Sequence, residues 1–206
     1  MSQKSVWVYC VGGGVSSLLL AAALARYPVL PGPVVVAEKK SKLGHPQSFG
    51  LWVGQTHPLD HLIKAKWPRW RFSLKGETSS VHSGLQQNYA LIEGEDFFDW
   101  VSQSIESHPQ ISILLNTELT TPPVARHILD SRPPPLSHFK SCQTFVGYDV
   151  ATTASGEYDC VDLMADMQMQ DDSLLFLYLL PKPNGNILIE WTAFGQRPFD
   201  LERLTA

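Results

Sequence analysis

The chain has 206 residues, of which 44% are hydrophobic and 17% are charged, and this composition is typical of a globular protein with a sizeable core. Its net charge of −4 argues against a nucleic-acid-binding protein, which usually has a basic surface. The three cysteines are odd in number and widely spaced, and the seven histidines show no metal-ligand spacing. We therefore expect a reducing compartment, no disulfide framework and no metal site.

The first expected elements are a strand, a helix and a second strand around a glycine-rich loop. Residues 6–11 alternate bulky β-formers and predict a strand, and the Leu- and Ala-rich residues 15–27 predict a helix that prolines end. Residues 34–37 form a short apolar run typical of a buried parallel strand, and Glu38 follows directly. A strand, a glycine loop, a helix, a strand and an acid, in this order, indicate a βαβ unit that binds a nucleotide.

The loop itself predicts a dinucleotide site. Gly12 allows a tight turn, and Gly14 lets the backbone approach a pyrophosphate at the helix N-terminus. Glu38 would accept hydrogen bonds from the adenosine ribose hydroxyls. The third glycine position of the motif is Ser17, a plain glycine turn is the alternative, and the loop alone does not separate FAD from NAD. The expected cofactor-binding residues are Gly12, Gly13, Gly14, Val15, Ser16, Glu38 and Lys39.

The remainder of the chain is predicted to consist mostly of strands. Residues 42–52 carry glycines and aromatics, as in a loop that passes over a ligand, and residues 67–74 predict a turn into a strand. Residues 88–105 predict a strand and then an amphipathic helix. The apolar face of this helix should consist of Phe97, Phe98, Val101 and Ile105. Further strands are expected at 111–117, 125–130 and 142–150, and a hairpin at 173–181 and 186–194.

These elements predict an α/β protein in two parts. Residues 1–60 should form an N-terminal dinucleotide-binding βαβ segment. Residues 61–206 should form a mostly β substrate-binding region, with elements of the first domain interleaved in it. Arg26 and three prolines interrupt the apolar residues 15–37, so no membrane span is expected.

Several short runs, taken in order, resemble a known family. The landmarks are "VGGGVSSLLLA", "WPRWRF", "YALIEGEDFFDWV", "DSR", "QTFVG", "LM", "FLYLLP" and "ILIEWT". Their order and spacing resemble the flavoprotein lycopene cyclase family of carotenoid biosynthesis, over about residues 6 to 195.

The resemblance implies a fold, a reaction and partners. The implied fold has a Rossmann-type FAD-binding domain and a β-sheet-rich substrate domain. The implied reaction is a redox-neutral isomerisation, in which lycopene ends cyclise to β-ionone rings with reduced FAD bound and NAD(P)H as the reductant. Lycopene or another acyclic carotenoid would be the substrate, and the protein would be cytoplasmic and associated peripherally with a membrane surface. Glu190, in the strand motif that reads E-x-T in the family, would be catalytic.

The chain departs from the family pattern at three points. Trp191 stands where a second acid or a small residue is common, and Asp166 is displaced by one residue in the run LMAD. Members of the family are also roughly twice as long and return to the FAD domain late in the chain. We therefore expect this sequence to be a fragment or a shortened relative, and an inactive relative is one alternative to a cyclase.

The residues around Glu190 suit acid catalysis. A carboxyl group on an apolar strand is desolvated, which keeps a proton available for a carbon–carbon double bond. Strand alternation should place Leu188, Glu190 and Thr192 on one face. A different FAD-dependent oxidoreductase or monooxygenase remains the other alternative. The candidate aromatic rings for stabilising a cation are Trp52, Phe176, Tyr178, Trp191 and Phe194, and ordinary core packing is the alternative for each of them.

Overall fold

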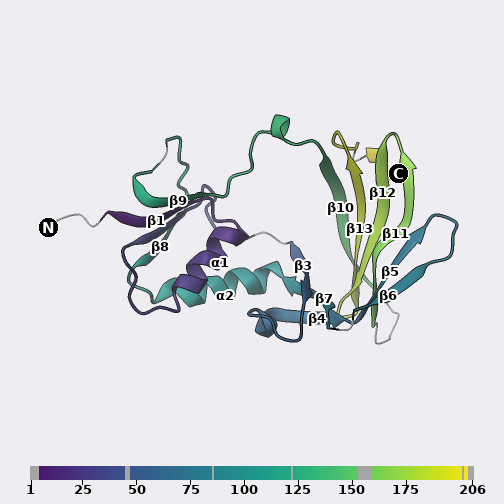
Figure 1. Ribbon diagram of the computed structural model, residues 1–206, viewed down its shortest axis with the longest axis horizontal. Coiled ribbons are helices and arrows are strands. Elements are labelled where there is room, and N and C mark those ends of the chain that lie inside the picture. The colour runs from purple at the N-terminus through teal and green to yellow at the C-terminus, as the bar shows by residue number, and fades with distance from the viewer. Residues whose placement is uncertain are drawn as a thin grey trace. The chain divides into compact units, whose positions relative to one another are not determined.

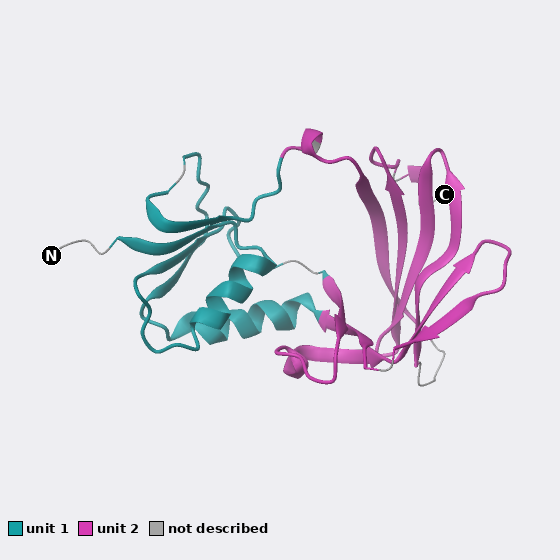
Figure 2. Cartoon of the chain, in the orientation of Figure 1, with its two compact units in different colours: residues 1–47, 93–134 teal, residues 48–92, 135–206 magenta. Residues whose placement is uncertain are grey.

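The computed structural model describes residues 5–44, 47–84, 86–121, 123–152, 159–200 and 202–203. The chain divides into two compact units, and each is assembled from two separate stretches (Figure 2). Unit 1 comprises residues 1–47 and 93–134, and unit 2 comprises residues 48–92 and 135–206. How cofactor and substrate binding divide between residues 1–60 and 61–206 stays a prediction.

Unit 1 is a four-stranded parallel sheet with two helices (Figure 1). The strand order is β8-β2-β1-β9, and the central strand β1 pairs with β2 on one side and β9 on the other. Val8, Cys10, Val34 and Val36 are buried in this unit. The elements are β1 (Val6–Val11), α1 (Val15–Leu24), β2 (Val34–Ala37), α2 (Gly94–Glu106), β8 (Ile111–Leu114) and β9 (Ala125–Asp130).

The two helices largely follow the sequence pattern. The four residues expected on the apolar face of α2 are all buried, which confirms that prediction. Helix α1 is shorter than expected, because it ends at Leu24 and not at Tyr27. Its last turn tightens, with the N–H of Tyr27 donating to the carbonyl of Leu24 at 3.0 Å. The prolines that follow cannot continue the helix.

Unit 2 contains two sheets. The larger has six strands in the order β10-β13-β12-β11-β5-β6, and the smaller has three in the order β3-β7-β4. The larger sheet comprises β5 (Arg69–Leu74), β6 (Ser80–Ser83), β10 (Cys142–Ala151), β11 (Cys160–Gln170), β12 (Ser173–Pro181) and β13 (Asn186–Gly195). The smaller comprises β3 (Ser48–Val53), β4 (Ile63–Trp67) and β7 (Asn88–Glu93), and short 3-10 turns occur at Asp60–Leu62 and Leu136–His138.

The hairpin expected near the end of the chain is present. Strands β12 and β13 pair antiparallel, and Tyr178 lies directly opposite Glu190. On the other side of β13, strand β10 places Gly147 opposite Glu190. Glu190 is therefore held in the middle of a paired strand, where the side-chain direction is set by the ladder.

One loop prediction is corrected by the smaller sheet. The loop expected at 42–52 is partly wrong, because Ser48–Val53 form β3 and pair with β7, while His45 and Pro46 lie outside the described residues. A pairing partner far along the chain makes Ser48–Val53 a strand, and the local sequence does not reveal such a partner. The turn into a strand expected at 67–74 is confirmed, because β4 ends at Trp67, Pro68 follows, and Arg69–Leu74 form β5.

The two sheets of unit 2 share a core. Buried Trp67 and Leu91 of the smaller sheet pack with Val161, Leu163 and Leu180 of the larger one. Unit 2 thus has an apolar interior between its sheets, which positions any polar group placed there. Within the described ranges, no helix is long and apolar enough to cross a membrane.

Candidate functional sites

The loop after β1 is shaped by close neighbours. Gly12 has a φ of +96°, and its N–H donates to the carbonyl of Ala37, the last residue of β2, at 2.8 Å. A methyl group on Gly12 would lie 2.8 Å from Oγ of Ser131, and one on Gly13 would lie 3.1 Å from Cβ of Glu38. The positive φ and the crowding therefore explain the first two glycines.

Glu38 lies against this loop. Its Oε2 accepts a hydrogen bond from the N–H of Gly13 at 2.7 Å, and its Oε1 accepts one from the N–H of Lys40 at 2.9 Å. Burial raises the pKa of Glu38, but these two hydrogen bonds and the charges of Lys40 and Lys39 outweigh it, so that the pKa lies below its ordinary value. Glu38 is therefore an anion, and its carboxylate keeps acceptor capacity for hydroxyl groups.

Gly14 borders a cavity of about 430 Å³ beside the loop. Its φ of −75° suits any residue, and among the described residues the neighbour within 4 Å that a methyl group there would meet is Oγ of Ser131, at 3.7 Å. Helix α1 starts at the next residue without a side-chain cap and without an acid in its first turn. Open space at an uncapped helix N-terminus is the geometry that suits a phosphate. These residues therefore fit a dinucleotide.

The structure brings most of the expected loop residues together. Gly12, Gly14, Glu38 and Lys39 line the cavity, and Gly13 joins them through its bond to Glu38. Val15 and Ser16 form the start of α1 and do not line the cavity. The other residues that line it are Val11, Ala37, Lys40, Thr117, Glu118, Leu119, Ser131, Arg132 and Pro133.

Ser131, at the end of β9, was not predicted as part of this site. Its Oγ lies 3.1 Å from the carbonyl oxygens of Val11 and Gly12, so it donates to the turn itself. It also accepts a hydrogen bond from Oγ of buried Ser17 at 3.2 Å. Ser17, which stands at the third glycine position, is thus tied to the loop through a residue 114 positions away. No local pattern could have revealed this bond.

Asp130 and Arg132 flank Ser131 and pair with each other. Nη2 of Arg132 lies 2.6 Å from Oδ2 of Asp130, and Nη1 donates to the carbonyl of Leu119 at 3.0 Å. Both groups of the pair are solvent-exposed. Because Arg132 also lines the cavity, its guanidinium fixes one wall of the candidate nucleotide site.

Glu190 lies in a second cavity, of about 300 Å³, between the two sheets of unit 2. Leu188, Glu190 and Thr192 all line this cavity, which confirms that the three share one face of β13. Leu163 of β11 and three residues of β12, namely Phe176, Tyr178 and Leu180, form a mostly apolar part of the cavity wall. The remaining lining residues are Ser48, Gly50, Tyr89, Leu91 and Gln143, and of the lining residues outside β13 only Phe176 and Tyr178 were predicted as candidates.

The environment of Glu190 favours its protonated form. Burial raises the pKa of Glu190 above its ordinary value, and the hydrogen bond that Oγ1 of Thr192 donates to Oε1 at 2.9 Å lowers it by less. A carboxyl group with a raised pKa is a candidate general acid, because it keeps its proton to a higher pH than an ordinary carboxyl does.

Aromatic rings from four strands line this cavity or lie next to a ring that lines it. Phe176 and Tyr178 line it, the ring of Phe194 lies 5.6 Å from that of Phe176, and the ring of Trp52 lies 5.1 Å from that of Tyr89. Trp191 does not line the cavity. It packs against a separate buried cluster of Leu175, Ala193 and Phe199, because neighbouring residues of a strand face opposite sides.

Asp166 lies apart from Glu190. It is exposed, has a φ of +52°, and falls where the register between β11 and β12 shifts. Its backbone N–H donates to Oγ of Ser73 at 3.0 Å. The one-residue displacement seen in the run LMAD therefore corresponds to a bulge in the strand, and the carboxyl does not line the cavity.

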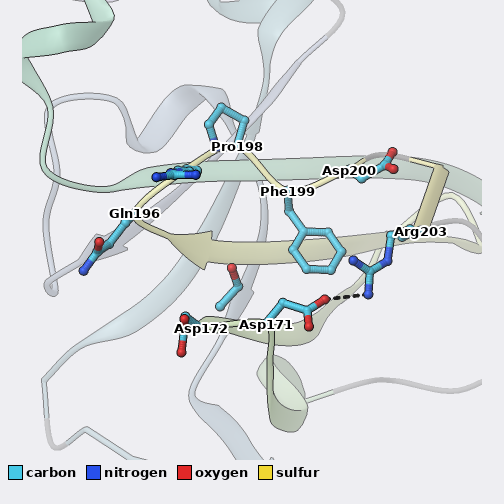
Figure 3. Close-up of a pocket in the computed structure, with 9 residues that line it drawn as sticks. Asp171, Asp172, Gln196, Pro198, Phe199, Asp200 and Arg203 are labelled. Atoms are coloured by element: carbon cyan, nitrogen blue, oxygen red, sulfur yellow. Dashed lines mark ion pairs between the residues drawn. The ribbon is translucent and has the colours of Figure 1, made fainter.

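A third cavity, larger than the two described above, lies elsewhere in unit 2. It measures about 820 Å³ and lies at the turn between β11 and β12, against the segment that follows β13. Arg203 pairs with Asp171 across it at 2.6 Å and lies over the ring of Phe199 at 5.3 Å (Figure 3). Asp172 and Asp200 also border it. None of the residues predicted to be functional lies in this cavity.

Solved structures share this fold. The chain resembles p-nitrophenol 4-monooxygenase PnpA from Pseudomonas putida, with 13% identity and a TM-score of 0.61 over 95% of this chain and 58% of that one. It also resembles a tryptophan halogenase from Shewanella frigidimarina, with 9% identity and a TM-score of 0.60 over 98% of this chain and 58% of that one. The chain thus spans about three fifths of the length of these structures. No curated protein matches it in sequence.

The fold and the loop geometry define the class. The chain has a mixed α/β fold shared with FAD-dependent enzymes, in which a parallel sheet carries a dinucleotide-type glycine loop and antiparallel sheets form a second unit. The model of the family described as lycopene cyclase protein matches residues 8–205. The chain therefore belongs to the lycopene cyclase family, which confirms the resemblance seen in the sequence.

Proposed function

We propose that this chain provides the dinucleotide loop and the catalytic acid of a lycopene cyclase. The observation that carries the proposal is the placement of Glu190, a half-buried carboxyl with a raised pKa in a cavity between two sheets, where leucine and aromatic side chains lie beside a few polar groups. Membership of the family supports the substrate class, an acyclic carotenoid end group. A cavity of about 300 Å³ has the size for one end group and not for a long polyene.

The proposed reaction is redox-neutral and begins with a proton from Glu190. The carboxyl O–H bond breaks and a C–H bond forms at one carbon of the terminal double bond, which leaves a carbocation. The neighbouring double bond attacks the cation and closes the ring. A proton then leaves a ring carbon, and the Glu190 carboxylate is placed to accept it, so that atoms and electrons balance. Phe176 and Tyr178 offer ring faces to the positive charge.

FAD is the cofactor that we propose for the glycine loop, with NAD(P)H as its reductant. The N-terminus of α1 and the space at Gly14 would hold the pyrophosphate, and Glu38 would accept the ribose hydroxyls. Reduced flavin, when bound, supplies a negative charge that stabilises a cation.

Expression in cells that accumulate lycopene tests the proposed function. We expect β-carotene or a singly cyclised product to form, measured by chromatography of extracted pigments, and no cyclised product from the Glu190→Gln variant. A flavin-dependent monooxygenase is the competing activity that the shared fold suggests. NAD(P)H oxidation coupled to oxygen uptake, together with unchanged lycopene, would favour that alternative.

Peripheral membrane association is a separate part of the proposal, because a carotenoid substrate resides in the bilayer. Residues 67–72, WPRWRF, combine tryptophans and arginines as interfacial segments do, but Trp67 is buried and Arg69 and Arg71 pair with Asp159 and Asp162, so this run does not support membrane contact. We expect an alkaline carbonate wash to release the protein from membranes. Recovery of all the protein in the unwashed soluble fraction would contradict this prediction.

A further inference from the structure

Two tyrosines, the buried Tyr89 and the partly buried Tyr178, share the cavity of Glu190. Tyr178 of β12 lies directly opposite Glu190 in the ladder, and Tyr89 of β7 reaches the cavity from the smaller sheet. The two hydroxyl groups are hydrogen-bonded to each other. Among the residues that line this cavity, these two phenols and the Glu190 carboxyl are the titratable groups.

The meeting of the two hydroxyls depends on Gly50 of β3. A methyl group on Gly50 would collide with the hydroxyl of Tyr89 and would lie 2.8 Å from that of Tyr178. Glycine thus leaves room for two phenol oxygens where the two sheets face each other. Strands β3, β7 and β12 together place the two tyrosine hydroxyls in the cavity of Glu190.

The tyrosine pair has one hydroxyl proton that its own hydrogen bond does not use. Two phenols carry two O–H protons, and the bond between them uses one. The other proton remains available to an acceptor in the cavity. The carboxyl of Glu190 already accepts from Thr192 through Oε1, and an ionised carboxylate has sites for further donors.

The charges in the site support this arrangement. Burial raises the pKa of Tyr178 far above its ordinary value, the neighbouring Tyr89 adds to the shift, and a negative Glu190 raises it further. Burial also raises the pKa of Tyr89, against the smaller lowering effect of its bond to Tyr178. Both phenols therefore stay neutral donors at physiological pH. On β10, the strand that pairs with β13, Asp149 lies opposite Leu188. The Oδ2 atom of Asp149 forms an ion pair with Nζ of Lys182 at 2.7 Å.

We propose that Tyr178, supported by Tyr89, is a positioning residue for Glu190: its hydroxyl donates a hydrogen bond, directly or through one water molecule, to the carboxylate that remains when Glu190 has given up its proton. The proposal rests on Glu190 being the acid of the proposed reaction. Loss of a proton from the half-buried carboxyl creates charge in a partly desolvated cavity, and a donor already in place stabilises that charge as it forms. Stabilising the anion also makes Glu190 a stronger acid.

The test replaces each phenol by phenylalanine and measures two quantities. In Tyr178→Phe the pKa of Glu190, followed by ¹³C NMR of the labelled carboxyl, should rise, because the anion has lost its donor. The kcat for cyclisation should fall ~10-fold, the scale of losing one hydrogen bond to a charged group, with KM little changed. Tyr89→Phe should have a smaller effect, since Tyr178 keeps its own proton. Glu190→Gln assigns the resonance.

Tyr148→Phe is the matched control, because Tyr148 is exposed on the same sheet and lies opposite Ile189, away from the cavity. It should leave the pKa of Glu190 and kcat unchanged. An unchanged Glu190 pKa in both Tyr178→Phe and Tyr89→Phe would overturn the proposal, whatever happens to stability. If the pKa rises but no variant or parent cyclises lycopene, the coupling stands and the proposed function fails. If Tyr178→Phe does not fold, a rise in the pKa of Glu190 in Tyr89→Phe alone supports the proposal. An unchanged pKa of Glu190 in Tyr89→Phe overturns it.

Discussion

Replacing Glu190 by glutamine should lower the turnover of lycopene cyclisation by at least ~10²-fold, the usual scale for losing a general acid. Glutamine keeps the shape of the side chain and can still accept the hydrogen bond from Thr192, but it cannot deliver a proton. Initial rates with lycopene in micelles, measured for the purified parent and variant, check the expectation.

The same substitution should not lower the free energy of unfolding. A loss of turnover in Glu190→Gln can then be assigned to the missing acid and not to unfolding. The pKa of Glu190 is higher in the folded chain than in the unfolded one, so the unfolded state loses its proton first as pH rises. Between the unfolded pKa and the raised folded pKa, the folded state holds more protons and stability falls with pH. Glutamine has no such pH-dependent loss. Denaturant unfolding at pH 7 should therefore show Glu190→Gln to be at least as stable as the parent.

Asp166→Asn is the matched control for the acid, because Asp166 is exposed and lies in a bulge outside the cavity. It should retain most of the cyclase activity. Full activity in Glu190→Gln would remove this residue from the mechanism. Equal losses in both variants would mean that the cavity of Glu190 is not the reaction site.

Replacing Gly14 by leucine should weaken FAD binding roughly 10- to 100-fold, the cost of overfilling a close-fitting site. The φ of −75° suits leucine, and the nearest protein atom to a new Cβ lies 3.7 Å away, so the fold should accept the change. The side chain would instead occupy the space at the start of α1 that we assign to the pyrophosphate. Flavin fluorescence titration of the purified chain measures the affinity.

Gly12→Ala is the control, because it should lower the stability of the fold, whereas Gly14→Leu should lower the affinity for FAD. The φ of +96° and the approach of Ser131 to 2.8 Å make any side chain at Gly12 strained. This variant should lose about 1 kcal/mol or more of unfolding free energy, visible in a thermal melt. A Gly14→Leu protein that binds FAD as tightly as the parent would show that the cavity beside the loop is not the cofactor site.

Features set by neighbouring residues could be predicted from the sequence. The first βαβ unit, the apolar face of α2 and the β12–β13 hairpin all depend on periodicity or turn residues within one segment. The orientation of Glu190 also followed from strand alternation. These predictions needed no knowledge of what lies across the fold.

Features set by distant partners could not be predicted. Strand β3 exists because β7 pairs with it, and Tyr89 matters because it meets Tyr178 across two sheets. Ser131 supports the glycine loop although no pattern around it suggests a role. The candidate acid was therefore visible in the sequence, whereas the groups that surround and position it required the structure.

The bond between Ser131 and the first glycine turn has a consequence for the order of events during synthesis. Ser131 leaves the ribosome 119 residues after Gly12, and the strand before it, β9, completes one side of β1. At roughly 5–20 residues per second, the nascent chain waits on the order of ten seconds before this partner emerges. During that interval the central strand β1 has an unpaired edge, and the turn lacks its support. Cofactor capture should therefore be a late, post-assembly event, and a ribosome stalled before Ser131 should display a chain that retains no flavin.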